Sequence, residues 1–493
     1  MLDIVANNTA PSVKGMYIGG QWVPAVRTFE DLNPSDNSLY ARIPDGSAAD
    51  MRRAIDAAQA AFGEWSGRAF HERAHLLLKI ADVWDRRKAD FCNAAMAEGG
   101  GWKGKGLFEA GYVAEVFRSA AALCYQSIGD VLPSEHHKFM MATRFPLGVV
   151  GVISPWNMPG ILTSRGFAAA LAVGNTIVLK PSEDTPYSGG LYFAEVLEEA
   201  GVPAGVFNVV TCSRESVGAV GDEMIGNPKV KAISFTGSTA VGRHIAAKCG
   251  AYLKKVCVEL GGKDSMILLE DADLDAAARA ANFGSFMHQG QVCMSTEKLL
   301  VHEKVYAPFM ERFLARARKL KTGHTNDPSN VIGPLVNNRQ ALRVKALIDD
   351  AVAKGATVEL GGRAWDNFVE PTVLANVNSS MNIWHDETFG PVVVVCPFRD
   401  ENEAVALNND TEYGLTAAVW SRDEARALRM AERLETGICH VNCQNINDEP
   451  HVPFGGTKAS GVGRYGGRWS LDAFTELRWI TLDRGGRHFP PQF

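Results

Sequence analysis

The sequence lacks the marks of a membrane, nucleic-acid-binding or exported protein. No stretch approaches the roughly 18 uninterrupted apolar residues of a transmembrane helix, so we expect no membrane partner. Lysine and arginine total 50 against 56 aspartate and glutamate, a net charge of −6, which argues against a nucleic-acid partner. Residues 1–15 show neither a basic nor an apolar signal region. Nine cysteines, an odd number, then favour reduced thiols and a cytoplasmic location.

Several common functional signatures are also missing. Gly99–Lys105 has the G-x-x-x-x-G-K spacing of a phosphate-binding loop, but Gly106 follows where Ser or Thr should hold magnesium. No G-x-G-x-x-G follows an expected strand, so the standard dinucleotide fingerprint is absent. The absence of a G-x-S-x-G elbow argues against a serine hydrolase. Cys439, His440 and Cys443 are spaced wrongly for a common zinc site, so we expect no metal.

The middle of the chain alternates short apolar runs with helical patterns. Its 493 residues suggest about three domains at roughly 150 residues each. The alternation, about every 25 to 30 residues, predicts βαβ units and a parallel sheet with helices on both faces, which is an α/β fold. Ligands of such sheets bind beyond the carboxyl ends of the strands. The expected strands are Val149–Ser154, Thr176–Leu179, Val206–Thr211, Val230–Phe235 and Val256–Leu260.

Helices and later elements follow from the same patterns. Apolar residues at helical spacing predict helices over Ser47–Gly63 and Phe70–Glu98, and a helical pattern covers Ala168–Val173. Pro391–Phe398 is expected to be a buried strand. Gly455–Gly467 is glycine-rich and is expected to be a loop.

Two expected strands end in polar residues suited to binding. PWNMP (155–159) places Asn157 in a rigid turn between prolines, where its amide can donate to a developing oxyanion. VLKPSE (178–183) places Lys180 and Glu183 where they could hold the sugar hydroxyls of a nucleotide. A plain turn and a solvated loop are the alternatives.

Two further strings offer a base and a nucleophile. VELGGK (258–263) puts Glu259 at an apolar strand end, where desolvation favours base chemistry near neutral pH. HQGQVCMS (288–295) puts Cys293 in a glycine-containing turn, where it could be exposed and activated as a thiolate. A structural ion pair and a packed cysteine are the alternatives.

Taken together and in this order, the four strings resemble the NAD(P)-dependent aldehyde dehydrogenases. FTGST (235–239), ETFGP (387–391), NNDTEYGL (408–415) and PFGGTKASGVGR (453–464) extend the resemblance over nearly the whole chain. HQGQVCMSTE, NDEPHVPFGG and GGRWSLDAFTELRWIT look most like the aromatic-aldehyde branch, which includes salicylaldehyde, benzaldehyde and vanillin dehydrogenases.

The resemblance implies a fold of three parts. A Rossmann-like NAD-binding domain would span 1–124 and 147–261, and an α/β catalytic domain would span 262–460. A small β oligomerisation arm would comprise 125–146 and 474–493. Its exposed edge in a monomer favours a homodimer or homotetramer.

The resemblance also implies roles for residues. Cys293 would attack the aldehyde, and Asn157 with the Cys293 backbone N–H would hold the oxyanion. Glu259 would activate the water that hydrolyses the resulting thioester. NAD is favoured over NADP because Glu183 repels a 2′-phosphate, although NADP remains possible. The implied cofactor contacts are Ser154, Pro155, Trp156, Lys180, Glu183, Phe235, Gly237, Ser238, Leu260, Gln340, Glu387 and Phe389.

Aromatic and methionine residues near these strings suggest a pocket for a flat ring, although core packing is the alternative. Phe286 belongs to this group, and Arg165 is a candidate substrate contact. The other candidate substrate contacts are Trp102, Phe108, Tyr112, Met158, Met294 and Phe454.

Some positions depart from the family pattern. Gly166 and Tyr465 stand where many members have the Lys and Glu that are thought to relay the proton of the base. Glu259 must then lose its proton through water or near Arg165. The other departures are Cys212, His288 and Lys298.

Four alternatives remain open at this point. The aldehyde could be aliphatic or a semialdehyde. Coenzyme A could release the thioester instead of water, although Glu259 argues against this. Cys293 could hydrolyse esters without a cofactor. The chain could also be a non-catalytic protein built on this fold.

Overall fold

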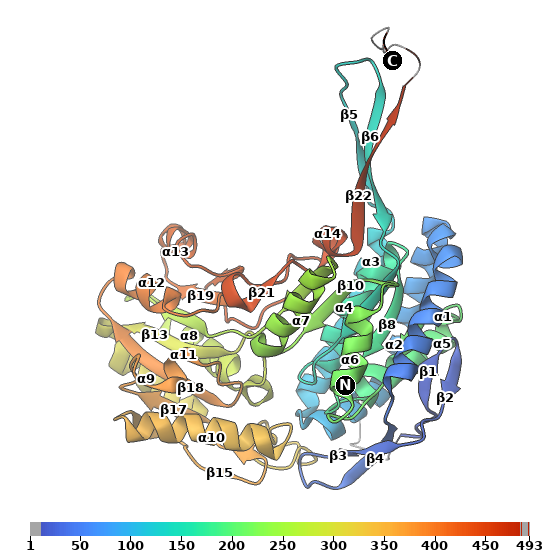
Figure 1. The fold of residues 1–493 in the computed structure, drawn as a ribbon. Helices are drawn as coiled ribbons and strands as arrows, with labels where there is room; N and C mark the ends of the chain where they lie inside the picture. The colour runs from blue at the N-terminus through green and yellow to red at the C-terminus, as the bar shows by residue number, and fades with distance from the viewer. Residues whose placement is uncertain (1–10, 484, 486–491, 493) are drawn as a thin grey trace.

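The computed structural model describes residues 11–483, 485 and 492, and two large sheets dominate it (Figure 1). The first sheet has eight strands in the order β2-β1-β9-β8-β7-β10-β11-β21. Its five central strands run parallel, as the sequence predicts. They are β7 (Val149–Ile153), β8 (Thr176–Lys180), β9 (Phe207–Val209), β10 (Val230–Thr236) and β11 (Lys255–Glu259). The antiparallel edge strands are β1 (Met16–Ile18), β2 (Gln21–Val23) and β21 (Gly461–Val462).

Helices cover both faces of the first sheet, which confirms the predicted layering. Val150 and Ile177 face one core cluster, and their neighbours Val149 and Val178 face another, because successive strand side chains point to opposite faces. The helices are α1 (Ala48–Gly67), α2 (Phe70–Gly99), α3 (Lys103–Leu123), α4 (Pro159–Ala172), α5 (Tyr192–Ala200), α6 (Val217–Gly226) and α7 (Thr239–Ala251), with a π-helical turn at Tyr187–Leu191 before α5.

Local signals explain where these helices begin and end. Ser47 caps α1 through a reciprocal pair of hydrogen bonds with Asp50. Gly100 ends α2 in a left-handed conformation, with φ of 63°. Helix α4 begins at Pro159, earlier than the predicted Ala168, because proline suits the first helical position. Asn157 therefore lies two residues before the start of α4.

The second sheet has seven strands in the order β14-β17-β18-β13-β12-β19-β20, all parallel except the β14 edge. Its strands are β12 (Asp264–Leu268), β13 (Thr296–His302), β14 (Thr357–Leu360), β17 (Thr372–Ala375), β18 (Val392–Phe398), β19 (Thr416–Trp420) and β20 (Ile438–Val441). Its helices are α8 (Leu274–Phe286), α9 (Glu303–Ala317), α10 (Asn338–Ala353), α11 (Asn382–His385), α12 (Glu401–Asn409) and α13 (Glu424–Ala431). Short strands β15 (Ala364–Trp365) and β16 (Phe368–Val369) form a hairpin beside α10.

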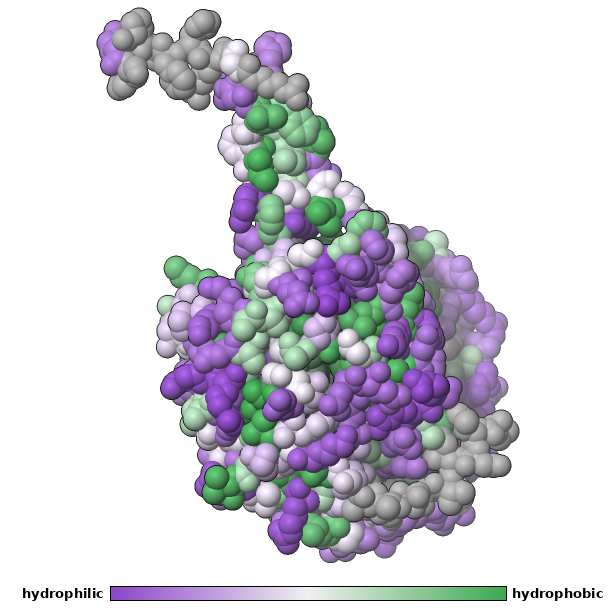
Figure 2. Space-filling model, turned by 90° about the vertical axis from the view of Figure 1, so that its right-hand side faces the viewer, coloured by the Kyte–Doolittle hydropathy of each residue, from purple (hydrophilic) through white to green (hydrophobic). Residues whose placement is uncertain are grey.

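A three-stranded antiparallel arm projects from the body (Figure 1). It consists of β5 (Gly129–Leu132), β6 (Phe139–Pro146) and β22 (Thr475–Leu482), and α14 (Ser470–Phe474) leads into it. Apolar side chains gather along it on the face shown in Figure 2. A separate hairpin pairs β3 (Thr28–Leu32) with β4 (Leu39–Pro44).

The structure adjusts one other expectation. Gly455–Gly467 is not simply a loop, because β21 lies within it and extends the first sheet. No helix among the described residues is long and apolar enough to cross a membrane. The division of the chain into three domains stays a prediction. The predicted domain boundaries include residues 1–10, 484, 486–491 and 493, which lie outside the described residues.

Candidate active site

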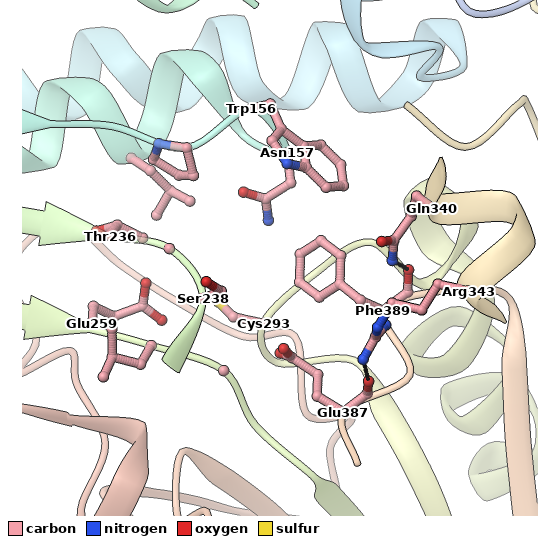
Figure 3. Close-up of a pocket in the computed structure, with 15 residues that line it drawn as sticks. Trp156, Asn157, Thr236, Ser238, Glu259, Cys293, Gln340, Arg343, Glu387 and Phe389 are labelled. Atoms are coloured by element: carbon pink, nitrogen blue, oxygen red, sulfur yellow. Dashed lines mark hydrogen bonds between the residues drawn. The ribbon is translucent and has the colours of Figure 1, made fainter. Parts of the chain in front are cut away.

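A cavity of about 250 Å³ opens at the carboxyl ends of the first sheet, facing loops of the second (Figure 3). All three predicted catalytic residues, Asn157, Glu259 and Cys293, line it together. Eight of the predicted cofactor contacts line it as well: Pro155, Trp156, Gly237, Ser238, Leu260, Gln340, Glu387 and Phe389. Leu162, Thr236, Gly261 and Arg343 complete the lining and were not predicted.

Cys293 lies in a short loop before β13. The loop follows His288 and Gln289, whose backbones are both in the left-handed conformation. Burial raises the pKa of the Cys293 thiol well above its usual range, and the charge of Glu259 raises it further. Cys293 is partly buried and lines the cavity, and its raised pKa favours the neutral thiol over the thiolate that the sequence suggested. A thiol with a raised pKa needs a base to take its proton at the moment of attack.

Glu259 can be that base. It is the last residue of β11 and is 2% exposed. Neither carboxylate oxygen accepts a backbone N–H from the described chain. Burial raises the pKa of Glu259 to about 7, while hydrogen bonding with Cys293 and the positive charge of Arg165 act in the opposite direction. The predicted desolvation is confirmed, and a carboxyl with this pKa can exchange a proton near neutral pH.

Asn157 projects its amide into the same space (Figure 3). Its Nδ2 donates to the Gln291 backbone oxygen at 3.0 Å, two residues before Cys293. The Gln291 side chain in turn accepts from the Val336 N–H at 3.0 Å. Because an amide NH2 group has two hydrogens, one fixes the orientation of the Asn157 side chain and the other is free for an oxyanion.

The cofactor side of the cavity fits a dinucleotide. Ser238 precedes α7, its side chain does not cap the helix, and the first turn has no acidic residue. This leaves backbone N–H groups for a diphosphate. Beyond Ser238, the rings of Trp156 and Phe389 meet edge to face, with centroids 5.3 Å apart, and offer a wall for a flat ring.

Hydrogen bonds from α10 and from the segment after β11 hold the Glu387–Phe389 loop in place. Gln340 Nε2 donates to the Phe389 oxygen at 2.9 Å, and Arg343 donates to the Thr388 oxygen at 2.9 Å. Glu387 accepts from the Gly262 N–H at 3.0 Å. Burial and the nearby Glu297 raise the pKa of Glu387 to about 8. Arg343 was missed, although its place one helical turn after Gln340 could have identified it.

The remaining predicted cofactor residues lie outside the cavity lining. Ser154 and Phe235 are buried. Lys180 ends β8, and its Nζ lies 3.8 Å from Glu183 Oε2. On the other side, Arg214 Nη1 lies 3.9 Å from Glu183 Oε1. Glu183 therefore has a cation on each side, which the sequence did not indicate.

The predicted substrate residues separate into two groups. Tyr112, Met158, Met294 and Phe454 are buried in the core cluster against which Cys293 packs. Arg165 lies with its guanidinium 4.0 Å from the centre of the Phe454 ring. It also forms an ion pair with Asp448 and a 3.4 Å hydrogen bond with the Tyr112 hydroxyl.

The second group belongs neither to that core cluster nor to the cavity lining. Phe108 is 50% exposed, and Trp102 precedes α3 as a partly buried residue. Phe286 stacks on Phe313 in the core of the second sheet, so its placement near the pocket is wrong. Most of the predicted aromatic and methionine residues are buried, but Phe108 and Trp102 are not, because the face to which each ring turns is set by tertiary packing.

The positions that depart from the family pattern are tightly packed. A Cβ on Gly166 would lie 2.9 Å from Val152 and 3.3 Å from Ser234. The buried Tyr465 hydroxyl bonds Ser234 at 2.9 Å and the Cys257 oxygen at 3.1 Å. These groups bind each other, so Tyr465 does not replace the missing relay carboxylate. Cys212, His288 and Lys298 are also buried.

Comparison with known proteins gives consistent results. The model of the aldehyde dehydrogenase family matches residues 22–480. A vanillin dehydrogenase of Pseudomonas fluorescens is 44% identical, over 96% of this chain and 99% of the relative. An NAD(+) benzaldehyde dehydrogenase of Pseudomonas putida is 40% identical, over 97% and 98%. The crystal structure of a salicylaldehyde dehydrogenase from Pseudomonas putida G7 complexed with salicylaldehyde is 38% identical, covers 97% of this chain and 99% of that chain, and gives a TM-score of 0.95.

Proposed function

Since this chain belongs to the aldehyde dehydrogenase family, we propose that it oxidises an aromatic aldehyde to the carboxylic acid with NAD, through a thioester on Cys293. The observation that carries the proposal is the meeting of Cys293, Glu259 and Asn157 in one cavity, beside a surface that fits a dinucleotide. The aromatic substrate is supported by relatives named for vanillin, benzaldehyde and salicylaldehyde.

The first half of the reaction forms the covalent intermediate. Glu259 takes the proton of the Cys293 thiol, and the thiolate sulfur attacks the aldehyde carbon to give a thiohemiacetal. The oxyanion that develops receives the free N–H of the Asn157 amide and the Cys293 backbone N–H. Loss of one such donor typically raises a barrier by about 3 to 4 kcal/mol.

The second half releases the product. Bound NAD supplies the acceptor for the hydride that leaves the thiohemiacetal carbon. Glu259 first gives up the thiol proton to solvent and so becomes a carboxylate again. It then removes a proton from water, whose oxygen attacks the thioester carbonyl; the C–S bond breaks, the Cys293 sulfur leaves as a thiolate, and the carboxylic acid is released. A buried carboxylate with a pKa of about 7 suits both proton transfers.

The cofactor preference depends on Glu183. Its carboxylate can accept the free 2′- and 3′-hydroxyls of NAD and repels the phosphate of NADP. Lys180 and Arg214 flank it at 3.8 and 3.9 Å and offset part of that repulsion. We therefore propose NAD as the preferred cofactor, with NADP accepted less well.

We expect the ring substrates to be preferred in a steady-state assay of NADH absorbance. Benzaldehyde, salicylaldehyde and vanillin should each give a kcat/KM about tenfold or more above that of an aliphatic aldehyde, because ring contacts contribute roughly 0.5–1.5 kcal/mol each beyond the buried area. NAD should give the higher kcat/KM of the two cofactors. Coenzyme A should not accelerate turnover, and the free acid should be the product.

The same assay identifies the competing functions. Preference for the aliphatic aldehyde would contradict the proposed aromatic substrate but would leave the proposed enzyme class in place. A strict requirement for coenzyme A would show an acylating enzyme. Turnover of an activated ester without NAD and without any aldehyde oxidation would show a hydrolase.

We also propose that the arm joins copies of this chain into a homo-oligomer. Leu477, Trp479 and Val131 on the arm are 54%, 67% and 71% exposed, and apolar groups on a free sheet edge favour association. Light scattering should then give a mass of at least two chains of 53.3 kDa each. Trp479→Glu should shift the protein toward smaller species, and a wild-type monomer at micromolar concentration would contradict the proposal.

A further inference from the structure

A buried ion pair lies beneath the cavity without lining it. Lys263 Nζ contacts Glu297 Oε2 at 2.6 Å and donates to the Thr388 hydroxyl at 3.1 Å. The side chains of Lys263 and Glu297 are 0% and 3% exposed. Glu297 also accepts the Thr388 N–H at 2.8 Å and the Phe389 N–H at 2.9 Å. We call these three residues, Lys263, Glu297 and Thr388, the Lys263 cluster.

Each member of the Lys263 cluster belongs to a different functional segment. Lys263 follows the proposed base Glu259 by four residues (263 − 259), in the link from β11 to β12. Glu297 follows the proposed nucleophile Cys293 by four residues (297 − 293), near the start of β13. Thr388 lies inside the Glu387–Phe389 loop. The cluster therefore ties together the base, the nucleophile and the loop on the cofactor side.

The loop depends on such anchoring because its backbone is strained. Phe389 has a φ of 50°, in the left-handed region that a bulky residue adopts only when its surroundings impose it. Glu297 holds its N–H and Gln340 holds its oxygen, at 2.9 Å each. This fixes the Phe389 ring edge-on to Trp156.

We propose that the Lys263 cluster is a positioning device that holds the Glu387–Phe389 loop in register with Cys293 and Glu259 for binding the nicotinamide half of the cofactor. None of its members lines the cavity, so Glu297 acts through the loop and not on the reacting atoms. The inference rests on the proposed function. It concerns the nicotinamide half alone, because the adenosine half is proposed to bind at Lys180 and Glu183.

The variant Glu297→Gln tests the proposal by binding measurements. Glutamine has one acceptor oxygen in place of two, so it cannot serve Thr388, Phe389 and Lys263 together. By calorimetry or quenching of Trp fluorescence, we expect the Kd of NAD to rise about tenfold or more. The Kd of ADP, which lacks the nicotinamide half, should change by less than about twofold. In turnover, KM for NAD should rise more than KM for the aldehyde.

A second variant separates positioning from folding. Glu297→Gln leaves the Lys263 charge unpaired in the interior, which can unfold a protein. Lys263→Met with Glu297→Met removes both charges and nearly conserves volume, so the protein should fold with a similar Tm. It still lacks the acceptor for the loop and should show the same selective loss of NAD affinity. Glu270→Gln, at the Arg426 pair beyond the opposite end of β12, is the control and should leave both Kd values unchanged.

The outcomes are distinct. A folded double variant that binds NAD like the wild type overturns the positioning role, and so does an equal loss of NAD and ADP affinity. Failure of the wild type itself to bind NAD would instead contradict the proposed function.

Discussion

Replacing Cys293 with alanine is expected to abolish aldehyde oxidation, with kcat falling by roughly 10⁴- to 10⁶-fold. The variant has no sulfur to attack the carbonyl, and no other cysteine lines the cavity among the residues that the structure describes. NADH absorbance in the presence of benzaldehyde measures the effect. Because the side chain becomes smaller beside the cofactor surface, NAD should still bind with nearly the wild-type Kd.

The matched control for this variant is Cys443→Ala. Cys443 is also a partly buried free cysteine, but it follows β20 and does not line the cavity. Its replacement should leave kcat within about twofold. Turnover by Cys293→Ala at even 1% of the wild-type rate, if reproducible in enzyme free of contaminating activity, would remove Cys293 from the mechanism.

Glu259→Gln is expected to lower steady-state kcat by about 10²- to 10⁴-fold, the usual contribution of a positioned base. Glutamine can take a proton neither from the thiol nor from water. The Cys293 thiol can still ionise to solvent, because the Glu259 charge that raises its pKa is gone, so the thioester should form and then accumulate. The same substitution removes a negative charge beside Cys293, and that charge raises the pKa of the thiol. The Cys293 pKa should therefore fall, and alkylation of Cys293 by iodoacetamide at pH 8 should become faster than in the wild type.

The pH profile of the wild type is the control for Glu259. The base acts when deprotonated, and burial raises its pKa from 4.5 to about 7. Activity should therefore be lost as pH falls through about 7 and should rise above it. The residual activity of Glu259→Gln should lack this inflection. A wild-type kcat that is flat between pH 5.5 and 8 would show that another group is the base.

Much of the fold follows from local patterns. The apolar runs and their spacing identified β7, β8, β10 and β11, since each strand is buried on both faces and short. The pairing of β21 with β11 joins residues about 200 positions apart and involves only two residues, so no local pattern could reveal it. The start of α4 at Pro159 was missed because the apolar pattern is clearest further along the helix.

The site divides in a similar way. The strings around Asn157, Glu259 and Cys293 could be recognised because chemistry restricts them, and the structure brings all three to one cavity. The charge state of Cys293 could not be predicted, since it depends on burial and on a carboxylate from another strand. Glu297 was overlooked for the same reason. In sequence it is one of two adjacent charged residues, Glu297 and Lys298, near the start of a strand. Its partners Lys263 and Thr388 are supplied only by the fold.

The most direct test of the proposed chemistry is mass spectrometry of Glu259→Gln after mixing with benzaldehyde and NAD. The proposed mechanism predicts a benzoyl thioester on the peptide that contains Cys293, formed together with about one equivalent of NADH per active site. The adduct should be absent without NAD. Formation of NADH without any adduct on Cys293, or with the adduct on another residue, would contradict covalent catalysis by this cysteine.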